Sequence, residues 1–237
     1  MWTMSKTLTS TSTSTNHCYN RRMRLFLSSQ DLGNYADVAF EMCGGSKRAA
    51  FILNAADDET PAVRADKLAR KRFMFENAGF AFEELDLRKY FGRGAELKEK
   101  LKEFDLVWCN GGNSFILSRA MCSSGLDTIL AELLSENKIM YGGSSAGSCV
   151  CAPSLHGAEY GDKPEPDVVP VDYPVKETIW DGLNLVPFSI IPHCDQEWFE
   201  NSAKESIAYY ESHNIPYKAL NDGEVVMVSG YKTEFLT

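Results

Sequence analysis

Gly143-Ser-Ser-Ala-Gly147 follows a short apolar run that begins at Ile139 and leads into a second run that ends at Ala152. This G-x-S-x-G pattern is typical of a sharp turn from a strand to a helix, with the serine at its apex. Glycines surround the serine because neighbouring Cβ atoms would clash in so tight a turn. We therefore predict a strand before the turn, a helix from Ala146 onward, and Ser145 as a nucleophile. The alternative is an ordinary glycine-serine turn, and the runs on both sides argue against it.

Strands and helices alternate along the rest of the chain. This pattern predicts an α/β fold, a mainly parallel sheet flanked by helices, in a single domain over residues 23–237. The predicted strands cover residues 24–29, 48–54, 80–87, 105–109, 138–141, 183–192, 218–220 and 224–229. The predicted helices cover residues 35–43, 62–77, 95–103, 114–121, 126–137, 146–152 and 199–212. The Asn221-Asp-Gly223 turn predicts that the last two strands form a hairpin.

The composition limits the partners that the protein can have. With 44% hydrophobic and 24% charged residues, the 237-residue chain can bury a substantial core. No apolar run approaches the about 18 residues that a membrane span requires. The net charge of −9 argues against binding to nucleic acid. We therefore expect neither a nucleic acid nor a membrane as a partner, and the sequence sets no oligomeric state.

The seven cysteines are odd in number, and several fall within predicted core elements, which is unlike a disulfide framework. They indicate a reducing compartment, and we expect the protein in the cytoplasm. Cys149 and Cys151 lie two residues apart but lack further cysteine or histidine partners at metal-ligand spacing. We therefore expect no metal site and no cofactor.

Residues 1–22 differ in composition from the rest of the chain. They are rich in serine and threonine and have too few large apolar residues to order themselves. A secretory signal is not predicted, because the segment has no continuous apolar core. It has basic residues and no acidic one, so a transit peptide is one alternative and a natural start at Met23 is another. We expect a disordered leader without a catalytic role.

Two other predicted strand ends carry candidate groups. Asn110-Gly-Gly-Asn113 follows one strand and precedes a helix, so its N–H groups can approach an anion closely and gain from the helix dipole. This turn is a candidate half of an oxyanion hole, and a simple helix cap at Asn113 is the alternative. His193 ends the apolar run 183–192, at the edge where sites in parallel sheets form. It is the best placed of the four histidines to serve as a base.

Three motifs together resemble a known peptidase family: Gly111-Gly-Asn113, Gly143-Ser-Ser-Ala-Gly147 and Ile190-Ile-Pro-His193. In this order they are similar to dipeptidase E, also called aspartyl dipeptidase, of serine peptidase family S51, to which the cyanophycinases are related. The resemblance covers about residues 23–229. It implies a fold like that of the class I glutamine amidotransferases, which is flavodoxin-like, with a serine where those enzymes have a cysteine.

The resemblance implies a role for individual residues. Ser145 is the nucleophile and His193 the base, and the backbone N–H groups of Gly112 and Ala146 form the oxyanion hole. This agrees with the interpretation from the residues alone, in which the residue after the serine and a glycine-rich turn supply the two donors.

The resemblance also places the acid that orients the histidine in the loop after the nucleophile helix. We choose Asp162 because it fits the family spacing, with Glu159 as the second choice. The loop, residues 154–181, offers four candidates in its first part: Glu159, Asp162, Glu165 and Asp167.

For the substrate, the resemblance implies small peptides that begin with aspartate, whose side chain needs a cation in the site. No arginine follows Arg119, and Asp195-Gln-Glu197 makes the rim after the histidine acidic. We therefore expect this rim to contact the free amino group of a substrate. Two alternatives remain: a cyanophycinase-like exo-hydrolase that acts on aspartyl-arginine polymer, and a non-catalytic binding domain with the same fold.

Overall fold

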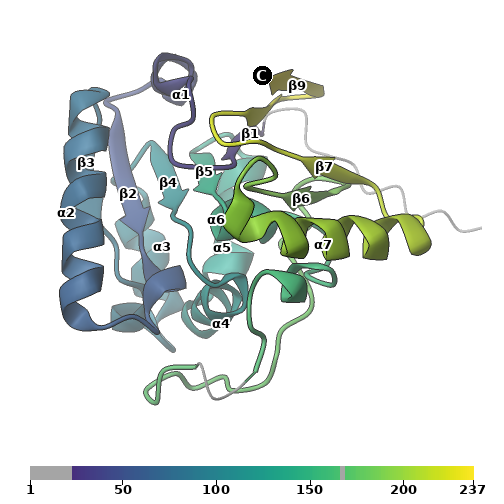
Figure 1. Cartoon of the computed structure of the whole chain (residues 1–237). Helices are drawn as coiled ribbons and strands as arrows, with labels where there is room; N and C mark the ends of the chain where they lie inside the picture. Colours follow the sequence, from purple (N-terminus) through teal and green to yellow (C-terminus); the bar gives the residue numbers. More distant parts are fainter. Residues whose placement is uncertain (1–22, 166–168) are drawn as a thin grey trace, which may run out of the picture.

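A computed structural model describes residues 23–165 and 169–237 of the chain. A seven-stranded sheet lies between two layers of helices, and a two-stranded sheet stands beside it (Figure 1). The predicted α/β class, with a mainly parallel sheet flanked by helices, is confirmed. The predicted leader, residues 1–22, lies outside the described residues, as does the candidate acid Asp167.

The order of the strands in the large sheet is β3-β2-β4-β5-β1-β8-β9. The first five positions are occupied by parallel strands, and β8 joins β1 in the antiparallel direction. Parallel strands that are covered on both faces are apolar along their whole length, and the inner strand β4 is entirely buried with the sequence Leu-Val-Trp-Cys. The bounds of the strands are β1 Arg24–Ser28, β2 Arg48–Ile52, β3 Ala81–Glu84, β4 Leu106–Cys109, β5 Met140–Ser144, β8 Val225–Ser229 and β9 Lys232–Leu236.

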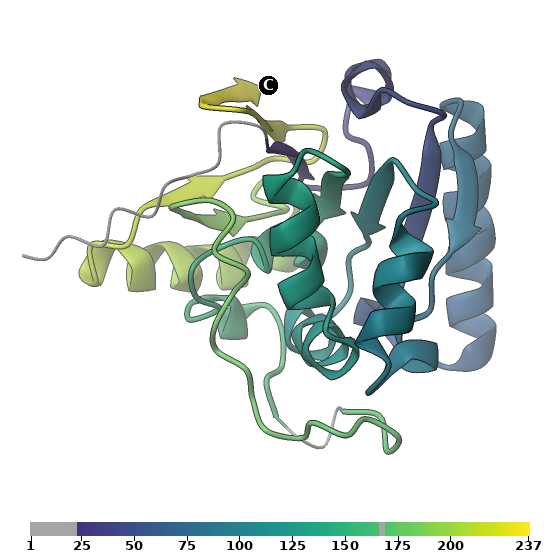
Figure 2. The same ribbon diagram turned by 180° about the vertical axis from the view of Figure 1, so that it is seen from behind.

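Each face of the large sheet has its own helix layer and its own core. Helices α1 (Ala36–Cys43) and α2 (Pro61–Asn77) cover one face and bury a cluster of aromatic rings around Phe75 and Trp108. Helices α3 (Gly94–Leu101), α4 (Ser114–Ser124) and α5 (Leu126–Ser135) cover the other face (Figures 1 and 2). In the described part of the chain, no helix is both long and apolar enough to cross a membrane.

The two-stranded sheet consists of β6 (Ser189–Ile191) and β7 (Tyr217–Ala219), which run parallel with α7 (Glu200–Ser212) between them in the sequence. The predicted hairpin around Asn221-Asp-Gly223 is therefore wrong, because β7 pairs with β6 whereas β8 pairs with β1 and β9. The turn connects two different sheets. The hairpin of this region is formed by β8 and β9, a strand that the sequence did not predict.

Candidate active site

Ser145 lies in the turn between β5 and the short helix α6 (Ala146–Cys149), as its motif predicts. Its backbone has φ 51° and ψ −115°, a strained conformation for a residue with a side chain. The turn is tight because α6 packs directly on β4: a Cβ atom at Gly147 would lie 1.9 Å from the carbonyl oxygen of Cys109. Because Gly147 has no Cβ atom, α6 can pack this closely on β4, and Ser145 lies at the carboxyl end of β5.

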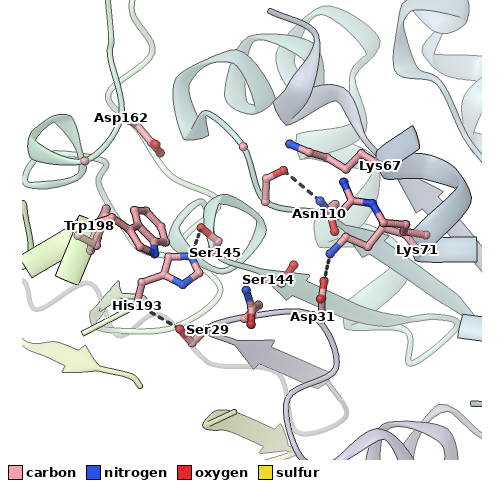
Figure 3. A pocket seen from close by; sticks show the side chains of 16 residues that line it. Ser29, Asp31, Lys67, Lys71, Asn110, Ser144, Ser145, Asp162, His193 and Trp198 are labelled. Carbon is pink, nitrogen blue, oxygen red and sulfur yellow. Dashed lines mark hydrogen bonds and ion pairs between the residues drawn. The ribbon is translucent and has the colours of Figure 1, made fainter. Parts of the chain in front are cut away.

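The hydroxyl of Ser145 is hydrogen-bonded to the ring of His193, with 3.0 Å between Oγ and Nε2 (Figure 3). His193 follows β6 and also has a positive φ, 57°. The strained backbone turns its side chain from the end of the small sheet toward the end of the large one. The structure thus brings together the two residues that the sequence predicts as nucleophile and base.

The carboxylate on the other ring nitrogen belongs to Asp222, whose Oδ1 lies 2.6 Å from Nδ1 of His193. Asp222 belongs to the turn that connects β7 and β8. The choice of Asp162 as the orienting acid therefore needs correction. Its Oδ2 accepts a hydrogen bond of 2.8 Å from the N–H of Ser114 at the start of α4, and the second candidate, Glu159, accepts one from the N–H of Gly157.

Ser29, at the end of β1, connects the base and the acid. Its Oγ accepts a hydrogen bond of 2.8 Å from the backbone N–H of His193 and donates one of 2.8 Å to Oδ1 of Asp222. Ser29 is fully buried, so loss of its hydroxyl would leave buried polar groups without partners. It therefore fixes both the strained histidine backbone and the carboxylate that faces the ring.

Asp162 lies near the site without touching the Nδ1 of the histidine. It lines the cavity next to Ser145 and Gly161. Burial raises the pKa of its carboxyl group to about 6, although the hydrogen bonds from Ser114 favour the charged form. A negative charge on Asp162 is thus present at neutral pH and is lost in mild acid.

Gly112 and Ala146, whose N–H groups the sequence predicts as oxyanion donors, both lie near Ser145: Gly112 lines the same cavity, and Ala146 is the next residue in the chain. Gly112 follows β4 in the turn that leads to α4. Neither N–H donates to a backbone acceptor among the described residues. Gly112 has φ 148°, and a Cβ atom there would lie 2.3 Å from the carbonyl oxygen of Ala55. Only glycine therefore fits at this point of the turn.

The same turn also caps α4, so the alternative interpretation of this segment is correct as well. The side-chain oxygen of Asn113 accepts hydrogen bonds from the N–H groups of Phe115 and Ile116, at 2.8 and 3.1 Å. The cap fixes the start of the helix and leaves the N–H of Gly112 outside it. The same turn thus caps α4 through Asn113 and leaves the N–H of Gly112 free of the helix.

A cavity of about 330 Å³ opens over Ser145 and His193. Its lining includes the exposed indole of Trp198, whose ring centroid lies 5.0 Å from that of His193. On the other side it is lined by residues of α2 (Figure 3). Within the described chain, no group of three or more His, Cys, Asp or Glu side chains is arranged to hold a metal ion.

The acidic rim after His193 has a different position from the one predicted. Asp195 does not belong to the lining of this cavity. Its carboxylate accepts a hydrogen bond of 2.9 Å from the N–H of Asp222. Asp195 therefore supports the turn that holds the acid.

Sequence reasoning missed Asp222, Ser29 and the cations of α2. For Asp222 a signal was present, because an Asp-Gly pair follows β7 at the end of a predicted strand, where site residues gather. For Ser29 the signal is weaker, since many strands end in serine. The α2 residues carry no local signal, because a helix of this composition is usually exposed to solvent along its charged face.

Comparisons with known proteins identify the family of the chain. Residues 25–236 match peptidase family S51. The chain is 27% identical over 208 residues to an uncharacterized peptidase of Pasteurella multocida, covering 87% of this chain and 93% of the relative. It is 30% identical over 148 residues to a Drosophila melanogaster protein named "Probable alpha-aspartyl dipeptidase", covering 59% and 56% of the two chains.

In structure, the chain is similar to a Listeria monocytogenes EGD-e protein that was crystallised as a candidate peptidase E. The TM-score is 0.73 with 23% sequence identity, over 90% of this chain and 98% of the other. This likeness concerns the fold. Because the family match covers nearly all of the described residues, the chain belongs to peptidase family S51 and is a hydrolase of peptide bonds.

Proposed function

We propose that the protein is a serine peptidase in which Ser145, His193 and Asp222 act as a triad. The observation that carries this proposal is the pair of contacts on the ring of His193: Nε2 to Ser145 at 3.0 Å and Nδ1 to Asp222 at 2.6 Å. A serine hydroxyl is a weak nucleophile unless a base accepts its proton. A carboxylate on Nδ1 keeps the proton there and leaves Nε2 free to accept.

In this mechanism Nε2 of His193 accepts the hydroxyl proton while Oγ of Ser145 attacks the peptide carbonyl carbon. The N–H groups of Gly112 and Ala146 donate to the oxyanion, and Asp222 stabilises the imidazolium that forms. His193 then gives its proton to the leaving amine. Water, activated by the same nitrogen, attacks the acyl-enzyme ester and releases the acid, which restores the hydroxyl of Ser145.

We further propose small peptides as substrates, with a preference for an N-terminal aspartate. The resemblance to dipeptidase E and the name of the Drosophila relative support this preference. The cavity supports small peptides as substrates, because about 330 Å³ is enough for a very short peptide.

The test is hydrolysis of a panel of dipeptides, tripeptides and N-acetylated peptides by the wild-type protein and by Ser145→Ala. We expect cleavage of free dipeptides that begin with aspartate, and a loss of about a thousandfold or more in the variant. Serine-dependent cleavage of other peptides alone would overturn the aspartate preference. Equal rates for the two proteins would overturn the serine mechanism, and release of aspartyl-arginine from cyanophycin would instead favour the exo-hydrolase.

A further inference from the structure

The side of the cavity that faces the catalytic pair is basic. It is formed by α2, from which Lys67, Arg70 and Lys71 line the cavity. These positions are three and four residues apart, so one face of the helix presents all of them. Figure 3 shows Lys67 and Lys71 across the cavity from Ser145 and His193. In a chain of net charge −9, this is a local concentration of positive charge.

The three cations are not equivalent. Lys71 is paired with Asp31, and both side chains line the cavity. The two opposite charges cancel, so this pair adds no net charge to the cavity. Lys67 is paired with Glu59 and Arg70 with Asp66, and neither of these two carboxylates lines the cavity. Lys67 and Arg70 therefore line the cavity, whereas the carboxylates that pair with them do not.

Both groups have more hydrogen-bond donors than their ion pairs use. An ammonium has three N–H donors and a guanidinium five, whereas Lys67 contacts one oxygen of Glu59 and Arg70 contacts one oxygen of Asp66 through Nη2 alone. The Arg70–Asp66 pair, at 3.0 Å, joins side chains that are 68% and 69% exposed. Such an exposed pair contributes little free energy and is readily exchanged for a ligand.

The opposite end of the cavity has the opposite sign, because Asp162 lines it beside Gly161. Ser145 lines it as well, together with the glycines of the oxyanion turn. A peptide bond held for attack therefore lies in a cavity with a carboxylate at one side and cations at another. This polarity selects how a charged substrate is oriented.

We propose that Lys67 and Arg70 bind a carboxylate of the peptide substrate, an inference that rests on the proposed peptidase function. α2 thereby supplies the cations that the segment after His193 lacks. The carboxylate has two possible sources: the side chain of an N-terminal acidic residue and the C-terminus of a dipeptide. A guanidinium fork and an adjacent ammonium fit either group in the same way.

The experiment uses four ligands: Asp-Ala, Asn-Ala, Asp-Ala amide and Asn-Ala amide. Binding is measured by calorimetry to the full-length Ser145→Ala protein, in which turnover is expected to be slow, alone and with Lys67→Met, Arg70→Met or both. The matched control is Arg72→Met, which removes a cation from the same helix outside the cavity lining. Circular dichroism confirms that each protein is folded.

We expect each substitution to weaken binding of Asp-Ala by about tenfold, as for loss of a charged hydrogen bond, with no change for Arg72→Met. If the side-chain carboxylate is bound, Asn-Ala and its amide lose this sensitivity. If the C-terminus is bound, both amides lose it. Equal losses on all four ligands, or no loss on any, would overturn the proposal.

The same ligands separate this inference from the proposed function. Failure of the wild-type protein to hydrolyse any of them would count against the proposed substrate preference and would leave the binding measurement intact. Hydrolysis by the wild type, with binding insensitive to Lys67 and Arg70, would confirm the peptidase and overturn the carboxylate site.

Discussion

Oδ1 of Asp222 lies 2.6 Å from Nδ1 of His193, although the two residues are 29 positions apart and follow different strands of the small sheet. The acid of the proposed triad thus comes after the histidine in the sequence. The acidic loop between the nucleophile and the histidine supplies Asp162 to the cavity instead. Each of the two aspartates thus has a distinct set of contacts.

Asp222→Asn is expected to lower kcat by about ten thousandfold, because an amide on Nδ1 favours the tautomer whose Nε2 cannot accept the serine proton. Asp162→Asn is the matched comparison, since it removes a carboxylate that lines the cavity and does not contact Nδ1 of His193. We expect Asp162→Asn to retain most of kcat. Steady-state kinetics on one peptide decide the matter, and a larger loss for Asp162→Asn would return the orienting role to that residue.

Ser29→Ala is expected to lower kcat by about tenfold with little change in KM, since it removes hydrogen bonds that position His193 and Asp222 rather than contacts with substrate. Because Ser29 acts through the triad, the same substitution in an Asp222→Asn background should cost much less. Additive losses in the double variant would show that Ser29 acts independently of the acid.

Gly112→Ala is expected to lower kcat by about a hundredfold or more, because the new Cβ atom collides with Ala55 and displaces an oxyanion donor. Gly92→Ala is a matched control: Gly92 also has a positive φ, 68°, but a Cβ atom there meets nothing within 4 Å. We expect the control to lose about 1 kcal/mol of stability and no activity. Normal turnover by Gly112→Ala would remove this N–H from the mechanism.

The raised pKa of Asp162 predicts a specific pH dependence of stability. The native carboxyl group, with a pKa of about 6, holds a proton that the unfolded chain releases near pH 4. Between these values the unfolded state binds fewer protons, so this group makes the free energy of unfolding fall as the pH rises. Relative to Asp162→Asn, the wild type should lose about 2 kcal/mol from pH 4 to pH 7. Urea titrations of both proteins measure the difference, and a constant difference would contradict the prediction.

The sequence was sufficient to propose Ser145 as nucleophile, His193 as base and the turn at Gly112 as oxyanion donor, because each proposal depends on local chemistry at a strand end. Ser145 needs a glycine-rich turn, and Gly112 needs a position where a Cβ atom has no room. Neither requirement involves distant parts of the chain. The class of fold was predictable for the same reason, since strands and helices are each recognised from their own periodicity.

The acid was not predictable in this way. Asn221-Asp-Gly223 has the composition of a hairpin turn, and a hairpin would have placed Asp222 at a solvent-exposed tip. Its true neighbours follow from β7 and β8 belonging to different sheets, which depends on long-range pairing. The cations of α2 were missed for a similar reason, because the direction of a helix face is set by packing.

The proposed triad spans the boundary between the two sheets: Ser145 stands on the large sheet, His193 follows the small one, and Asp222 joins them. Turnover therefore requires that the small sheet remain docked on the large one. A modest separation of the two would abolish hydrolysis while nearly all helices and strands persisted. In a denaturant titration, activity should thus disappear before the circular dichroism signal changes. Loss of activity then reports the separation of the two sheets.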